Sequence, residues 1–566
     1  MILAINHTAH CRIIVPNGCD EVTQYAAEEL ARFLGEIAGA NFPIGKEPAR
    51  DGDILVGFGC ADLPEEGYRY HTGGGCLHFC GSGRGLLYGV YAFLEDTLGI
   101  RFFTPEVTHI PRRSCIEIGC IDKSGAPVME YREPSIWELR DQAFAARRRV
   151  NGLLRRENTP KYGGGVGYAE GFFVHTFTKL LPPDVYFDAH PEYYAEINGQ
   201  RQREKTQLCL SNPDVLELVK KQVLEELRKQ PGARLFSVSQ DDNYNGCTCE
   251  ACRRFDESEG SMAGSMIRFV NAVAEAIEPE FPDVVIDTLA YQYTRKPPKH
   301  IRPRHNVSVR LCSIECCFVH PLRNCRVDDP DAPQVGPSQP FAEDLIGWGK
   351  VCRRLYIWDY VTNFSHFWMP HPNHFVLADN VRFFAENGVK GVFEQGCPAP
   401  GGGEMTGLRA YVLSKALWNP DVDEELLINE YLNGVFGHAG VYMRRYLETV
   451  YNAVIQSDSH LYCFNHPDKP WHTMELVRQC EGIFNEAERV ADNEEILLRL
   501  QKQRLAVRYL EILLTPKGSQ ARNDLIDNFR PDAERFGLTQ LWERKDMDFC
   551  LKVLRGEEDP GYWWTK

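Results

Sequence analysis

The stretch Leu235–Asn243, LFSVSQDDN, is a short apolar run that ends in a group of polar side chains. A short apolar run of this kind is typical of a buried strand in a parallel sheet. A helical pattern follows it, in which apolar residues recur at helical spacing from Met266 to Ile277, ahead of Pro279. A strand followed by a helix in this way predicts an α/β fold.

The same alternation extends through residues 126–405. We count eight short β-rich runs, each followed by a helical or loop segment. Eight strands in a segment of this length predict a central (β/α)8 TIM-like barrel. The runs are Ser135–Leu139, Gly171–Phe177, Tyr193–Ile197, Leu235–Ser239, Val284–Leu289, Val307–Ser313, Arg354–Asp359 and Gly391–Glu394.

Two further regions flank the predicted barrel in this chain of 566 residues. Residues 1–125 alternate strand candidates with two amphipathic helical patterns, which predicts a small N-terminal α/β domain. Residues 406–566 carry long helical patterns and no strand candidates, which predicts a C-terminal α-helical domain. The strand candidates of the first region are Cys11–Val15, Asp53–Gly57, Cys76–Cys80 and Ile116–Ile121.

The composition is that of a soluble globular protein, with 43% hydrophobic and 25% charged residues and a mean hydropathy of −0.36. The net charge of −16 repels the nucleic-acid backbone and anionic lipid, so we expect no nucleic-acid and no membrane partner. Met1–Ala9 lacks a basic region and a sustained apolar stretch, which predicts a cytoplasmic location unless an export signal has been removed.

Polar and aromatic residues stand where most of the predicted barrel strands end. In this fold the reacting groups come from the carboxyl ends of the strands, so we expect these side chains at one rim of the barrel. The residues are His175 in the second run, Asp241, Asp242 and Asn243 after the fourth, Tyr291 and Tyr293 after the fifth, Glu315 after the sixth, Trp358 and Asp359 in the seventh, and Glu394 in the eighth.

Carboxylates beside Tyr and Trp are what carbohydrate chemistry requires. A glycosidic oxygen needs a proton to leave, the oxocarbenium-like centre needs nearby negative charge, and flat rings bind sugar faces. Asp241 and Asp242 are adjacent, and two carboxylates that share a site have pKa values that move apart. The alternative is that one of the two only caps the next helix.

Three cysteines follow the acidic pair closely, as Cys247-x-Cys249-x2-Cys252. Three thiols in six residues resemble part of a structural zinc site, and Cys209 is a candidate fourth ligand. A metal or a disulfide would fix this loop beside the acidic residues, and reduced unliganded thiols are the alternative. We expect no cofactor in catalysis.

Several motifs together resemble the bacterial DUF4838 family, part of which has been reclassified as glycoside hydrolase family 163, the endo-β-N-acetylglucosaminidases that act on N-glycans. The N-terminal region resembles the domain that precedes the barrel in family 20 hexosaminidases and family 67 α-glucuronidases. The motifs for the first resemblance are Ser237–Asn243, the three cysteines, Arg268–Asn271, Leu289–Thr294 with Pro297–Lys299, His190–Tyr194, Leu208–Pro213 and Phe393–Gly396, and those for the second are Ala26–Leu30 with Gly39 and Ala40, and Arg84–Glu95.

The resemblance implies a retaining glycosidase that cleaves β-linked N-acetylglucosamine by substrate assistance. Asp241 and Asp242 are then the first candidates for the acid and for the residue that orients the acetamide, and Glu394 is the competing acid. Candidate sugar contacts are Tyr291, Tyr293, Trp358, Asp359, His175, Glu315 and Asn243, with barrel packing as the alternative for Trp358.

Two other functions remain open from the sequence. One is an exo-acting glycosidase such as an α-glucuronidase, in which Glu394 or Glu315 is the acid. The other is a catalytically silent carbohydrate-binding protein that keeps the aromatic residues of the rim. In each case the partner is a glycan, and the sequence leaves the oligomeric state open.

Overall fold

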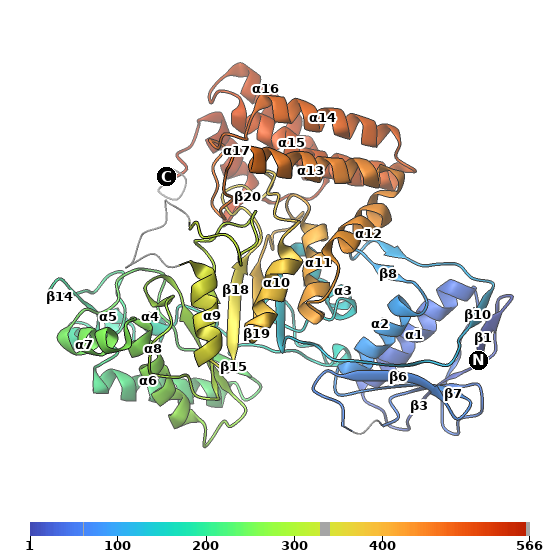
Figure 1. Cartoon of the computed structure of the whole chain (residues 1–566), viewed down its shortest axis with the longest axis horizontal. Coiled ribbons are helices and arrows are strands. Elements are labelled where there is room, and N and C mark those ends of the chain that lie inside the picture. Colours follow the sequence, from blue (N-terminus) through green and yellow to red (C-terminus); the bar gives the residue numbers. More distant parts are fainter. Residues whose placement is uncertain (60–61, 329–339, 562–566) are drawn as a thin grey trace.

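The structure is a computed structural model that describes residues 1–59, 62–328 and 340–561. Figure 1 shows three regions. The N-terminal sheets and two helices (blue) lie to one side, a central parallel sheet with its helices follows (green to yellow), and a group of long helices (orange to red) lies above it. No helix within the described ranges is long and apolar enough to cross a membrane.

The N-terminal region contains a six-stranded mixed sheet covered by two helices. Helix α1 (Glu21–Ala38) begins where the Asp20 carboxylate accepts a hydrogen bond from the backbone N–H of Thr23, and it ends at Gly39 in the left-handed conformation. Helix α2 (Gly85–Asp96) packs against α1. The sheet order is β11 (Asp122–Gly125), β6 (Tyr68–Gly73), β7 (Cys76–Gly81), β5 (Ile54–Val56), β3 (Ile13–Val15) and β4 (Ile44–Lys46), and a separate sheet holds β10 (Cys115–Glu117), β1 (Ile2–Ile5) and β2 (Thr8–Ala9).

The central sheet is parallel, curled and six-stranded. Its interior strands are nearly continuous apolar runs, as expected when both faces of a sheet are covered. In the register, Trp358 lies opposite Phe393 and Asp359 lies opposite Glu394. The strand order is β12 (Tyr131–Ser135), β19 (Val389–Gln395), β18 (Leu355–Tyr360), β17 (Val307–Cys312), β16 (Val285–Ala290) and β15 (Leu235–Ser237).

Two of the eight expected strands are absent from this sheet, and a third is displaced. Gly171–Phe177 forms turns, because Gly171 and His175 both have a positive φ, before helix α4 (Phe177–Leu180) begins. Tyr193–Ile197 contains only the two-residue β13 (Glu196–Ile197), which pairs antiparallel with β14 (Gln200–Arg201). The first strand was expected at Ser135–Leu139. In the structure it is β12, which ends at Ser135, and a 3-10 helix occupies Trp137–Arg140.

Short extended segments join the two edge strands of the sheet. Gly152 N–H donates to the Arg132 carbonyl of β12 at 3.2 Å, and Leu153 N–H donates to Val166 O at 3.1 Å. Ala169 N–H then donates to Leu235 O of β15 at 2.8 Å. Hydrogen bonds therefore run from one edge strand to the other, and the sheet is curled around an interior lined by alternate residues of its strands.

Helices surround the curled sheet on its outer face. Helix α8 (Ala263–Ile277) packs on β16 and on α6 (Pro213–Lys229), and α10 (Leu377–Glu386) packs on β19. Helix α11 (Thr406–Trp418) contacts α10 and β12. The remaining long helices, α12 (Glu424–Phe436), α13 (Gly440–Gln456), α14 (Met474–Arg489), α15 (Glu494–Leu514), α16 (Gln520–Arg535) and α17 (Met547–Arg555), form the C-terminal helical region.

A fully buried ion pair lies inside the curled sheet. Arg310 on β17 and Asp287 on β16 approach to 3.0 Å, and neither side chain is exposed. The Ser308 hydroxyl and the Tyr168 hydroxyl both donate to Asp287, at 2.6 and 3.1 Å. The guanidinium also faces the rings of Tyr168, Phe173 and Trp358, with centroid distances of 4.9, 4.7 and 5.7 Å.

Removing one partner of this pair should destabilise the protein strongly. Asp287→Leu leaves a buried guanidinium without its counter-ion, so we expect a loss of about 3–5 kcal/mol in the free energy of unfolding. The double variant Asp287→Leu/Arg310→Met should lose less than the sum of the two single variants. Urea unfolding of the four proteins measures this coupling, and additive losses would show that the pair is energetically uncoupled.

Candidate active site

Adjacent residues Asp241 and Asp242, just beyond β15, have different surroundings. The Asp241 carboxylate is half-buried and accepts a hydrogen bond from the backbone N–H of Thr178 in α4 at 3.0 Å. Burial raises the pKa of Asp241. Asp242 is exposed, and one of its oxygens accepts a hydrogen bond from the Tyr291 hydroxyl at 2.9 Å. Only Asp242 of the pair is therefore freely open to a ligand.

Tyr291 lies beside Asp242, and His175 lies beside Tyr291, at the carboxyl edge of the sheet, which we call the mouth. The Tyr291 ring is buried against Leu289 and Cys312, so its hydroxyl is held in one position. The His175 ring lies 6.3 Å from the Tyr291 ring, and its Nδ1 is 2.9 Å from the carbonyl oxygen of Gln240. The structure thus brings together three of the residues that the sequence singled out.

Asn243 and Tyr293 both make packing contacts with the loop after β15 and its neighbours. The Asn243 side-chain oxygen accepts hydrogen bonds from Gln207 and from the backbone of Asn245, and its amide donates to Thr206 O. The Tyr293 ring lies so close to Gly246 that an added Cβ there would meet it at 2.9 Å. The role of both residues as sugar contacts stays a prediction.

Glu394 and Asp359 lie on the outer face of the sheet, which corrects the expectation that Glu394 faces Asp242 across the mouth. Their neighbours in sequence, Phe393 and Trp358, make a ring contact of 4.8 Å in the interior, and alternate residues of a strand point to opposite faces. Glu394 is fully buried, and neither of its oxygens has a hydrogen-bond partner among the described residues.

Burial raises the pKa of both outer carboxyls, to about 6 for Asp359 and well above its usual range for Glu394. The Ser313 hydroxyl donates to Asp359. Buried carboxyls on the outer face have no access to a ligand in the mouth. The sequence could not distinguish the faces, because one residue of strand register decides them.

Trp358 and Glu315 lie near the mouth but have structural partners. The Trp358 indole packs on Phe173 in the interior and donates to the Gln395 side chain at 2.8 Å. Glu315 pairs with Arg295 at 3.4 Å, and burial raises its pKa. Arg295 is also paired with Asp328 and Asp344, each at 2.9 Å.

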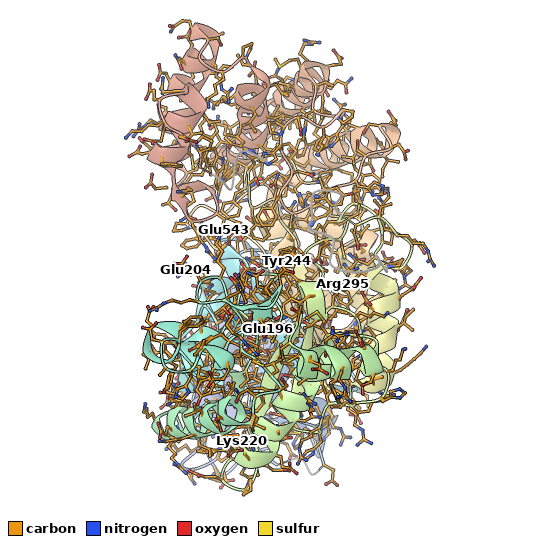
Figure 2. The ribbon with its side chains drawn as sticks, turned by 90° about the vertical axis from the view of Figure 1, so that its left-hand side faces the viewer. Glu196, Glu204, Lys220, Tyr244, Arg295 and Glu543 are labelled. Carbon is orange, nitrogen blue, oxygen red and sulfur yellow. The ribbon has the colours of Figure 1, made fainter. Side chains whose placement is uncertain are left out.

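A second carboxylate at the mouth, Glu543, comes from the C-terminal helical region. It lies in the turn between β20 (Gln540–Trp542) and β21 (Lys545–Asp546). Its carboxylate accepts a hydrogen bond from Gln395 of β19 at 3.4 Å, and its backbone N–H donates to Phe364 O at 3.0 Å. In Figure 2 the labelled side chains of Glu543, Tyr244 and Arg295 lie along the boundary between the C-terminal helices and the central region.

The charges around Glu543 connect it with Asp242. Burial raises the pKa of Glu543, nearby Arg544 and Arg155 lower it, and the negative charge of Asp242 raises it again. The charge of Asp242 also acts on Tyr244. Burial raises the pKa of Tyr244, and the negative charges of Glu315 and Asp242 raise it further. The sequence carries no local signal of this contact, because Glu543 stands in a short turn about 300 residues from Asp242.

Cys209 and the three cysteines after β15, which the sequence suggested as metal ligands, form one cluster. Their sulfur atoms all lie within 4.8 Å of one another, and all four side chains are buried. The Cys209 sulfur lies 3.7 Å from that of Cys249 and 4.0 Å from that of Cys252, and none of the four is in a disulfide. Tetrahedral zinc with Zn–S bonds of ~2.3 Å separates its sulfur ligands by roughly 3.8 Å, so this donor set fits zinc.

The fold places the protein among α/β proteins with a curled parallel sheet, an architecture shared with glycoside hydrolases. The family GH115 4-O-methyl-α-glucuronidase BtGH115A, with specificity for decorated arabinogalactans, superposes with a TM-score of 0.58 at 10% identity over 98% of this chain and 80% of the enzyme. By sequence the chain belongs to the DUF4838 family, a domain of unknown function, whose model matches residues 102–448.

Two further glycosidases are similar at lower scores. The Flavobacterium johnsoniae chitobiase FjGH20 has a TM-score of 0.43 at 11% identity, covering 95% of this chain and 97% of that enzyme. The Clostridium perfringens enzyme CpGH89, in complex with GlcNAc-α-1,4-galactose, has a TM-score of 0.48 at 11% identity, covering 91% and 64%. No curated protein sequence matches the chain.

The charges at the mouth predict two opposite pKa changes at Glu543. Arg544→Ala removes a positive charge that stabilises the carboxylate, so the pKa of Glu543 should rise. Asp242→Asn removes a negative charge and should lower it. Carboxyl NMR titration with labelled glutamate, assigned through Glu543→Gln, measures both changes.

Arg489 in α14 is exposed and is not among the charges that shift the pKa of Glu543, so it provides the matched control, and Arg489→Ala should leave the titration of Glu543 unchanged. A Glu543 pKa that responds to neither Arg544→Ala nor Asp242→Asn would contradict the placement of Glu543 in the field of the mouth.

Proposed function

We propose that the protein is a glycoside hydrolase whose two working carboxylates are Asp242 and Glu543. The proposal rests on the position of both carboxylates at the mouth, where the surroundings of the two side chains differ. Asp242 is exposed and accepts a hydrogen bond from Tyr291, whereas Glu543 is half-buried with a raised pKa. A proton donor and a charged acceptor are the two groups that glycoside hydrolysis requires.

In this scheme Glu543 protonates the glycosidic oxygen as the bond to the anomeric carbon breaks. Its raised pKa keeps the carboxyl protonated at a higher pH than an ordinary glutamic acid, which suits a proton donor. Asp242 stabilises the positive charge that develops on the sugar ring, and Tyr291 fixes the Asp242 carboxylate by its hydrogen bond. Asp241 positions the loop through Thr178.

For the substrate we propose a glycan with β-linked N-acetylglucosamine, cleaved with retention by substrate assistance and endo-acting, as in family 163. Asp242 would then accept a hydrogen bond from the acetamido N–H, and the acetamido oxygen would attack the anomeric carbon. Support comes from the sequence motifs around Asp241 and Asp242 that resemble family 163. The N-terminal resemblance to family 20 enzymes agrees with this substrate class.

A second candidate substrate is a uronic-acid glycoside, and the arginines at the mouth favour it. Arg155 and Arg544 are exposed and act on Glu543 through their charge, so a sugar carboxylate bound there would meet two cations. This alternative keeps Asp242 and Glu543 in their roles and requires no acetamido group. The likeness to BtGH115A concerns the fold and does not choose between the substrates.

We also propose that the cluster of Cys209, Cys247, Cys249 and Cys252 binds a structural zinc ion. The cluster has four thiol ligands and therefore no open position for a substrate or a water. Its zinc would hold the loop after Asp242 against the loop that carries Cys209. The scheme for hydrolysis uses no cofactor.

Substitution of the two carboxylates should separate their roles. Glu543→Gln should lower kcat on a natural glycan by about 10²–10⁴, and much of this should return on an aryl glycoside whose leaving group needs no proton. Asp242→Asn should lower kcat on both substrates without such recovery. Steady-state kinetics on the two substrates measures this.

The matched control for these variants is Glu117→Gln, which makes the same change at an exposed position of β10 in the N-terminal region and should keep full activity. Turnover by Glu543→Gln and Asp242→Asn close to that of the unchanged protein would remove both residues from the mechanism.

A substrate panel distinguishes the proposed classes. We expect the protein to release sugars from N-acetylglucosaminides and not to cleave glucuronides. Mass spectrometry of the released sugars measures this. Cleavage of glucuronides alone, with a loss of at least tenfold in kcat/KM for Arg544→Ala, would favour the uronoside. Binding of glycans without any turnover would contradict the glycosidase and indicate a carbohydrate-binding protein.

A further inference from the structure

A second cluster of soft ligands lies away from the carboxylates of the mouth, where the loop after β17 meets the C-terminal helical region. Cys317, His320 and Cys325 come from the loop between β17 and helix α9 (Phe341–Val351). His460 comes from the segment between α13 and α14. The four ligand atoms all lie within 4.8 Å of one another, although 135 residues separate Cys325 from His460.

The distances within this cluster match those between the ligands of one metal ion. The Cys317 sulfur is 3.3 Å from His320 Nδ1, and the Cys325 sulfur is 3.7 Å from His460 Nδ1. A tetrahedral zinc ion with Zn–S bonds of ~2.3 Å and Zn–N bonds of ~2.0 Å places sulfur and nitrogen ligands roughly 3.5 Å apart. Two thiols with two imidazoles are a donor set of structural zinc sites.

The surroundings of the two imidazoles also suit a metal. The rings of His320 and His460 approach each other with centroids 5.0 Å apart and planes inclined at 62°. Among the described residues, no carboxylate forms an ion pair with either ring. The Cys317 side chain is buried and the other three are partly buried, so the ligands are shielded but can be reached by an ion.

We propose that Cys317, His320, Cys325 and His460 bind a zinc ion that joins the loop after β17 to the C-terminal helical region. The site is separate from the four-cysteine cluster and does not depend on the proposed hydrolase activity. All four ligands belong to the protein, so the zinc would be structural and would have no open position for catalysis.

The backbone around the cluster shows what such a zinc would hold in place. Phe318 N–H donates to Leu461 O at 2.7 Å, and Phe364 N–H donates to Cys463 O at 2.8 Å. Glu543 N–H in turn donates to Phe364 O. The same loop carries Glu315 at the mouth. Zinc here would therefore fix the segment against which the turn of Glu543 is hydrogen-bonded.

Metal analysis of single variants tests the proposal. The purified full-length protein should hold two zinc ions per chain by inductively coupled plasma mass spectrometry, one in each cluster. His460→Gln should hold one, and Cys249→Ser, which removes a ligand of the other cluster, should also hold one. The combined variant should hold none.

Two further variants guard against loss of zinc through misfolding. His460→Cys keeps a zinc ligand at position 460, so it should bind the second zinc ion that His460→Gln loses. If the imidazole only packed against its neighbours, a cysteine there would not restore the ion. Cys120→Ser changes an exposed cysteine outside both clusters and should keep two ions. Cobalt-substituted protein should lose part of its thiolate-to-cobalt absorption in Cys325→Ser.

Two results would overturn the proposal. One is an unchanged zinc content in both His460→Gln and Cys325→Ser. The other is a disulfide between Cys317 and Cys325 in the unreduced protein, detected by peptide mass spectrometry. The readout is metal content and not turnover, so a protein that fails to cleave glycans would still confirm or refute this zinc site.

Discussion

The buried ion pair of Asp287 and Arg310 requires polar and aromatic partners inside the curled sheet. An uncompensated charge at this position would be very costly, so the hydroxyls of Ser308 and Tyr168 and three aromatic rings complete the environment of the pair. One of those rings is Trp358, whose indole donates to Gln395, and Gln395 donates to Glu543. A continuous series of contacts therefore leads from the ion pair to the mouth.

The mouth is assembled from two regions of the chain. The curled sheet supplies Asp242, Tyr291 and Gln395, while the C-terminal helical region supplies Glu543. Asp242 and Glu543 each lie near a segment that belongs to, or contacts, one of the two candidate zinc clusters. Cys247 of the four-cysteine cluster comes five residues after Asp242, and the segment after His460 contacts the segment that bonds the turn of Glu543. Metal binding at these clusters would fix the spacing of the two carboxylates.

The sequence predicted those parts of the fold that depend on local pattern. The apolar runs of β15 to β19 were found because a strand buried on both faces is almost continuously apolar. The second and third strands were wrong, since the extended segments 151–153 and 166–169 are too short and irregular to leave a pattern. Cys209 was proposed because zinc needs a fourth ligand beside the three neighbouring cysteines, and the structure brings the four thiols together. The role of Asp242 stays a prediction.

The parts that failed depend on tertiary contacts. Glu394 lies at the carboxyl end of β19, whereas Asp242 comes after β15, and only the register of the strands shows on which face of the sheet Glu394 lies. Glu543 and His460 belong to segments whose neighbours are far away along the chain, so no spacing rule identifies them. The resemblance to a glycosidase family pointed to the carboxyl edge of the sheet and carried no sign of Glu543, which the C-terminal region adds beside Gln395.

The most direct test is a crystal structure of the Glu543→Gln variant with a bound glycan that it does not cleave. We expect a sugar at the mouth, with the glycosidic oxygen within hydrogen-bonding distance of the residue 543 side chain and the ring beside Asp242 and Tyr291. A glycan bound elsewhere, or bound at the mouth with residue 543 out of contact, would contradict it.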